Sequence, residues 1–72
     1  MDVERLVYMA NQIGKFFAHK PEAEAVAAIE VHLRQFWDPR MRAAILASDG
    51  AGLDRLPRAA VERLRQAAPT GA

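Results

Sequence analysis

The chain has 72 residues, a formal net charge of +1 and no cysteine. This length allows one small domain, which buries only about 60% of the surface that its unfolded chain exposes. The absence of cysteine excludes disulfides, thiolate zinc sites and iron–sulfur clusters held by this chain. Helix packing and partner binding are therefore the expected sources of stability.

Hydropathy and charge argue against two further classes. No run approaches the roughly 20 apolar residues of a membrane span, and the first residues, Met1-Asp2-Val3-Glu4-Arg5, carry acids where a signal peptide is basic. Residues 1–37 hold four basic and five acidic side chains, and residues 38–72 hold six and four. A nucleic-acid-binding domain is usually clearly basic. We expect a cytoplasmic chain that binds neither membrane nor nucleic acid.

Helical periodicity predicts an all-α domain of about four helices, because Val, Ile and Thr never alternate over a strand length. The first helix should run from about Val3 to Ala18 with Asp2 as N-cap. Its apolar stripe comprises Leu6, Ala10, Ile13 and Phe17, flanked by Val3, Val7 and Gly14 on one side and by Met9 and Phe16 on the other. This face is wider than the roughly 100° that one core contact needs. Either a later helix covers its second flank, or the flank is a docking patch.

Two breaks define the second helix. His19-Lys20-Pro21 ends the first helix, since the residue before proline avoids the helical region, and Pro21 suits the first position of the next. The second helix should end at Phe36 or Trp37, and the short connection predicts an antiparallel hairpin. Its expected stripe is Ala25, Ile29, Leu33 and Phe36, with Val26 and Trp37 on one edge and a packed, hydrogen-bonded His32 on the other. In the first helix, Gly14 lowers helix stability by about 1 kcal/mol relative to alanine. Because a glycine lets another backbone approach closely, its presence predicts a close helix crossing there.

Asp38-Pro39 should open a third helix over residues 39–47, with Asp38 as N-cap and Met41, Ile45 and Leu46 as its apolar residues. Residues 48–52 form a loop by composition. Asp54 or Leu56-Pro57 opens a last helix of about ten residues, with Leu56, Ala60, Val61 and Leu64 inward. We expect one domain over residues 1–68 and a disordered tail over residues 69–72.

Catalytic and metal-binding patterns are absent from the sequence. His19 and His32 have no partner at the spacing of a zinc-binding helix. No nucleophile elbow surrounds Ser48, and Asp49-Gly50-Ala51-Gly52 lacks the lysine of a phosphate-binding loop. We expect a chain that is not an enzyme by itself and holds no cofactor.

The segment Phe36-Trp37-Asp38-Pro39-Arg40-Met41-Arg42 contains the single Trp and two arginines beside a helix break. Trp and Arg are enriched among residues that dominate binding energy. The alternative is that the aromatics are core and the arginines solvated. By its place on the stripe, Phe36 fits the core, whereas Trp37 at the stripe edge is open to either role.

Several strings resemble the delta subunits of molybdenum-containing NAD-dependent formate dehydrogenases. They are Met9-Ala10-Asn11-Gln12-Ile13-Gly14, Phe16-Phe17, His32-Leu33, the segment from Phe36 to Arg42, and Gly52-Leu53-Asp54. The resemblance spans about Leu6 to Leu64. It implies an accessory subunit of a cytoplasmic complex that oxidises formate and reduces NAD. Molybdenum bound by two pterin guanine dinucleotides, iron–sulfur clusters and FMN would lie on other subunits.

The resemblance implies docking on the large molybdenum-binding catalytic subunit, to stabilise it or to assist its maturation. From these strings and their positions we predict partner contacts by Phe16, Phe17, Trp37, Arg40 and Arg42. We also predict that Ile13, Ile29, Leu33 and Phe36 are mainly core. A free-standing homodimeric helical adaptor is the alternative, because the wide first-helix face can bury itself on a second copy. A helix-turn-helix DNA binder fits poorly, since the third helix is short and apolar.

Overall fold

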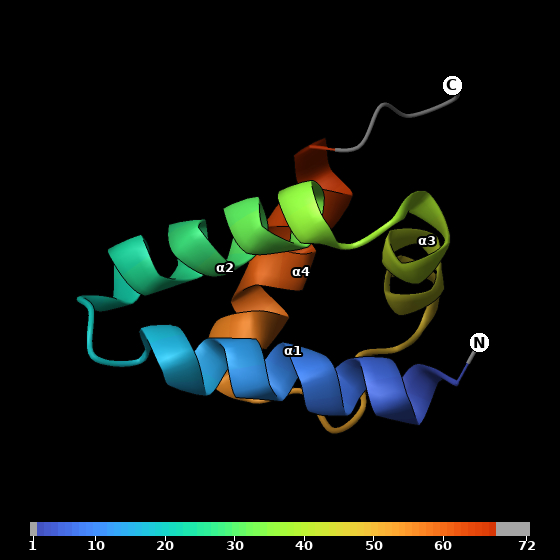
Figure 1. The fold of residues 1–72 in the computed structure, drawn as a ribbon, viewed down its shortest axis with the longest axis horizontal. Coiled ribbons are helices and arrows are strands. Elements are labelled where there is room, and N and C mark those ends of the chain that lie inside the picture. Colours follow the sequence, from blue (N-terminus) through green and yellow to red (C-terminus); the bar gives the residue numbers. More distant parts are fainter. Residues whose placement is uncertain (1, 68–72) are drawn as a thin grey trace.

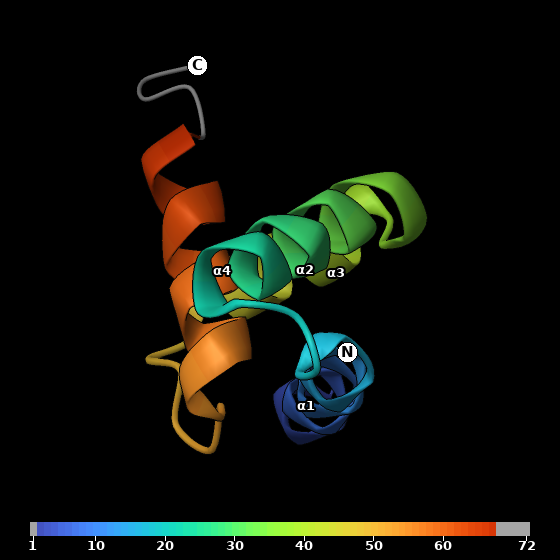
Figure 2. The ribbon, with the colours of Figure 1, turned by 90° about the vertical axis from the view of Figure 1, so that its left-hand side faces the viewer.

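The computed structural model describes residues 2–67, which form four helices. These are α1 (Val3–Phe17), α2 (Glu22–Phe36), α3 (Pro39–Ala47) and α4 (Arg55–Ala67). The described part contains no strand, so the all-α prediction is confirmed. After a short turn α2 runs back past α1, while α4 crosses behind both helices (Figure 1). Seen almost along α1, the axes of α1 and α2 are inclined to each other (Figure 2). The predicted tail over residues 69–72 lies outside the described residues.

Capping side chains set the helix starts as predicted at two places. Asp2 precedes α1 and accepts a hydrogen bond from the Glu4 amide at 3.0 Å, and Asp38 precedes α3 and accepts one from the Met41 amide at 2.9 Å. Such caps satisfy amide groups that a helix leaves unpaired. Pro21 differs from the prediction by one residue, because it takes the cap position and α2 begins at Glu22.

The core lies where α2 packs most extensively against α4, with α1 and α3 closing it. Ile29 and Leu33 from α2, Ile45 from α3 and Pro57 from α4 are the largest fully buried side chains. Ile29 and Leu33 are thus core residues as predicted, whereas Ile13 is only partly buried against the core. Leu56 also lies at the edge of the core, since Pro57 takes the inward position beside it.

Gly14 is the point where α1 meets α4. A Cβ atom at this position would lie 2.8 Å from Cδ and 3.2 Å from Cγ of Pro57. Real Cβ atoms essentially never come within 3.0 Å of such atoms, and the proline ring is fixed to its own backbone. The predicted helix crossing at Gly14 is therefore confirmed, and glycine is required for it.

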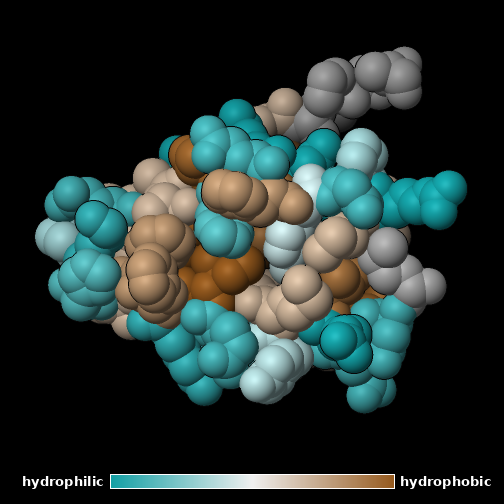
Figure 3. Space-filling model, in the orientation of Figure 1, coloured by the Kyte–Doolittle hydropathy of each residue, from teal (hydrophilic) through white to brown (hydrophobic). Residues whose placement is uncertain are grey.

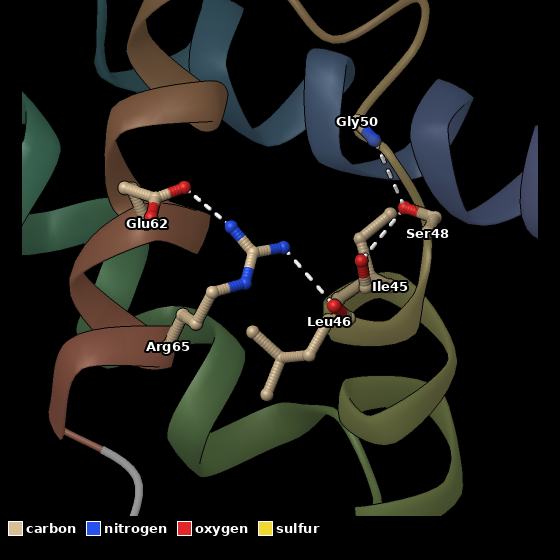
Figure 4. A network of polar contacts seen from close by, with 6 residues as sticks. All are labelled: Ile45, Leu46, Ser48, Gly50, Glu62 and Arg65. Atoms are coloured by element: carbon tan, nitrogen blue, oxygen red, sulfur yellow. Dashed lines mark hydrogen bonds and ion pairs between the residues drawn. The ribbon is translucent and has the colours of Figure 1, made fainter.

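Polar contacts hold the loop between α3 and α4 against the rest of the domain. The Asn11 side chain bridges to it, donating from Nδ2 to the Gly52 carbonyl at 3.0 Å and accepting at Oδ1 from the Asp54 amide at 2.8 Å. Within the loop, the Ser48 hydroxyl donates to the Ile45 carbonyl at 2.7 Å and accepts from the Gly50 amide at 3.2 Å (Figure 4). The loop is thus fixed at both ends.

Arginine side chains of α4 link this helix to α2 and α3. Arg65 pairs with Glu62 on its own helix and donates from Nη2 to the Leu46 carbonyl at the end of α3, 3.0 Å away (Figure 4). Arg63 Nε lies 2.9 Å from Oε1 of Glu30, whose Oε2 also pairs with Arg34 at 2.5 Å. Glu30 is the one buried charged residue of the described part, and the two arginines balance its charge.

Replacing Gly14 by alanine should destabilise the domain. Helix propensity alone favours alanine by about 1 kcal/mol, but overpacking against the Pro57 ring should cost roughly 1–3 kcal/mol. We expect a lower urea midpoint for Gly14→Ala than for the wild type. The control is Lys15→Ala, an exposed neighbour on the same helix, which should shift stability by no more than about 0.5 kcal/mol. A Gly14→Ala chain that is more stable than the wild type by the full helix-propensity gain of about 1 kcal/mol would contradict the close crossing.

Candidate docking surface

Four rings from α1 and α2 form a continuous aromatic cluster on the surface. Phe16 and Phe17 meet edge to face with centroids 5.0 Å apart, and the Phe17 ring lies 6.4 Å from that of His32. His32 in turn lies 4.7 Å from Phe36 at an interplanar angle of 38°. Phe16 is 72% exposed and Phe36 is 70% exposed. The aromatic cluster (Phe16, Phe17, His32 and Phe36) therefore presents two large apolar rings to solvent.

The helix order explains why these rings meet. Phe16 and Phe17 end α1, and the short connection through Pro21 brings α2 back beside them. Because α4 covers the other side of the α1–α2 pair and α3 lies at one end of it, this side is left open (Figures 1 and 2). Figure 3 shows the result as apolar surface exposed between the two helices, bordered by hydrophilic side chains.

The open surface is hollowed by three depressions of 310, 380 and 390 Å³. Each is lined in part by His32, and the side chains around them are mainly apolar. Clefts of this size accept side chains of a partner, and an exposed apolar patch bordered by polar residues is typical of a protein-interaction site.

Phe36 and Trp37 lie in different environments, Phe36 on the surface and Trp37 in the core. Phe36, predicted as core, is largely exposed, so that prediction is wrong. Trp37, predicted as a partner contact, is only 4% exposed and belongs to the core. The cause is the end of α2: Trp37 is its C-cap with φ −85° and ψ 136°, so the chain turns there and no longer follows the helical period. The Trp37 side chain therefore occupies the core position that helical periodicity predicts for Phe36.

The two predicted arginines also have different surroundings. Arg42 is partly buried, and its Nη1 donates to the carbonyls of Arg34, at 3.1 Å, and of Trp37. It thereby satisfies carbonyl groups at the C-terminal end of α2. A cationic side chain is favoured there because the C-terminal end of a helix carries a partial negative charge. Arg40 is exposed on α3. Of the five predicted contact residues, Phe16 and Phe17 lie in the aromatic cluster, whereas Trp37 and Arg42 support the chain around it.

The histidines lie in this region without forming a metal site. His19 is exposed, with Nδ1 3.2 Å from the Phe16 carbonyl. His32 is packed as predicted, but its contacts are with the rings of Phe17 and Phe36 and not the predicted hydrogen bond. Among residues 2–67, no three His, Asp or Glu side chains are grouped closely enough to hold a metal ion. No helix in this range is long and apolar enough to cross a membrane.

Sequence reasoning missed Phe36 and His32 as surface-forming residues. The wide apolar face of α1 did signal an uncovered flank, and its Phe16 and Met9 side lies there. The signal for Phe36 was its place in the last helical turn, one residue before a Trp that can replace it in the core.

The described part of the chain is thus a small four-helix domain with an exposed apolar surface between α1 and α2. A family model for the delta subunit of NADH-dependent formate dehydrogenase, FdsD, matches residues 5–61 of the chain. The chain belongs to this formate dehydrogenase delta-subunit family. Searches of curated proteins and of solved structures give no match.

The exchanged places of Phe36 and Trp37 predict different effects on stability. Trp37→Ala should destabilise the isolated chain by about 3–5 kcal/mol, because it empties a core site. Phe36→Ala should change stability by about 0.5 kcal/mol or less, as expected of an exposed side chain. Urea unfolding followed by circular dichroism measures the free energy of unfolding of both variants. The value for Trp37→Phe should lie between theirs. An equal loss of stability in the two alanine variants would contradict the assignment of Trp37 to the core and Phe36 to the surface.

Proposed function

We propose that this chain is a non-catalytic accessory subunit that docks through its aromatic cluster on the large molybdenum-binding catalytic subunit of formate dehydrogenase. Membership of the delta-subunit family supports a place in the complex. The observation that carries the docking site is the exposure of Phe16 and Phe36 on one surface. Burying a phenylalanine side chain contributes roughly 1.5–3 kcal/mol, so two such rings are a substantial driving force for association.

The division of chemistry within the complex is part of the same proposal. This chain has no cysteine for an iron–sulfur cluster, and the three depressions around His32 have mainly apolar linings. The molybdenum cofactor, the iron–sulfur clusters and FMN would therefore be held by larger subunits, in the cytoplasm. Docking would stabilise the catalytic subunit or hold it in a state that accepts its cofactor.

The docking site can be tested by co-purification of the tagged chain with the native complex. The test variant carries Phe16→Ser and Phe36→Ser together, and the matched control carries Gln66→Ser on the exposed side of α4. We expect the control to recover the catalytic subunit, identified by mass spectrometry, together with its molybdenum. The double variant should recover at least about tenfold less, because a loss of 1.4 kcal/mol already corresponds to that factor.

Two results would contradict the proposal. One is equal recovery of the catalytic subunit by the double variant, with unchanged helicity of the chain. The other is a wild-type chain that elutes as a dimer and recovers no formate dehydrogenase subunit, which would favour the homodimeric adaptor.

A further inference from the structure

The open side of the α1–α2 pair is built from two matching rows of side chains. The row on α1 consists of Tyr8, Met9, Gln12, Ile13, Phe16 and Phe17. The row on α2 consists of Ala27, Ala28, Val31, His32, Gln35 and Phe36. Each row follows the spacing i, i+1, i+4, i+5, i+8, i+9, which places its members on one face of a helix. Ten residues of helix span roughly 14 Å, so the rows border a groove of about three turns.

The lining of this groove is uncharged. Neither row contains Asp, Glu, Lys or Arg, although 26% of the chain is charged. Trp37 and Met41 close one end and are uncharged as well. A complementary partner surface is one that places apolar side chains here, since a charged group would lose its hydration without gaining an opposite charge.

The same lining restricts the backbone conformation of the partner. Its polar groups are few: the hydroxyl of Tyr8, the amides of Gln12 and Gln35, and the ring of His32. A partner loop or strand lying here would bury amide and carbonyl groups that these side chains cannot all satisfy. A helix satisfies its backbone internally and offers only side chains to the groove.

We propose that the groove binds one amphipathic helix of the catalytic subunit, of about three turns, with apolar side chains at positions i, i+3 or i+4, and i+7. This partner helix packs in the groove, in contact with both α1 and α2. Its apolar side chains enter the three depressions around His32. This inference rests on the proposed function, because it names the kind of segment that docks on the surface described above.

Photo-crosslinking from both walls of the groove tests the helix directly. Phe16 on α1 and Phe36 on α2 are replaced, one at a time, by p-benzoylphenylalanine in the tagged chain within the purified complex. After irradiation, adducts are mapped by mass spectrometry. We expect both positions to react with one segment of the catalytic subunit. The modified residues should fall within about 11 residues, which is three helical turns, and be spaced by three or four. The same replacement at Gln66 on α4 is the control and should leave this segment unmodified.

The outcomes separate the helix from the docking itself. If the wild-type chain recovers no formate dehydrogenase subunit, the proposed function fails. If the complex is recovered but the two positions react with distant segments of the catalytic subunit, the helix is refuted and the docking is not. If they react only with a second copy of this chain or with no protein, docking through the aromatic cluster is refuted as well. As a second readout, a proline in the middle of the identified segment should reduce recovery of the complex at least tenfold relative to alanine there, because proline breaks a helix interior.

Discussion

The contact between Gly14 and the Pro57 ring is the constraint on which the arrangement of the helices depends. It lets α4 cross α1 so closely that no side chain fits between them. From that crossing, α4 runs on across α2 and packs against it more extensively than any other pair of helices does, and Ile29 and Leu33 of α2 are fully buried. Among residues 2–67, no further helix or strand covers the other side of α1 and α2. The close packing on one face and the open groove on the other are therefore two consequences of the same crossing.

Polar contacts reinforce this asymmetry. Asn11 holds the loop that leads into α4, and Glu30 links α2 to Arg63 of α4. Arg42 caps the end of α2 where the chain turns into α3. None of these contacts uses a side chain of the aromatic cluster, whose rings touch one another while Phe16 and Phe36 remain largely exposed. The surface that a partner would cover is thus carried on a framework that is fixed without it.

Much of the fold follows from local rules that can be applied to the sequence. Asp2, Pro21, Asp38 and Pro39 mark helix starts to within about a residue. A glycine inside a helical pattern is enough to locate the helix crossing at Gly14. The rules fail at Trp37 because helical periodicity ends where the backbone leaves the helix, and they fail at Phe36, in the last turn of α2, because the neighbouring Trp37 fills the core instead. The side chain of Trp37, which follows the last helical turn, is oriented by the extended backbone at the C-cap and not by helical periodicity.

The binding surface was less predictable than the fold for a related reason. A wide apolar face on α1 shows that something covers it, yet whether α2, α3, α4 or a partner does so depends on crossing angles that the sequence does not encode locally. Arg42 is a similar case: its type suggested recognition of a partner, but the carbonyls it contacts are those at the end of α2. Membership of the delta-subunit family gives this open surface its biological context.

The most direct test of this account is a cryo-electron microscopy structure of the formate dehydrogenase complex containing this subunit. The account predicts that Phe16 and Phe36, 72% and 70% exposed in the isolated chain, become buried against the catalytic subunit while Trp37 keeps its place in the core. A complex in which both phenylalanines stay exposed, and in which the outer faces of α3 or α4 make the contact instead, would contradict it.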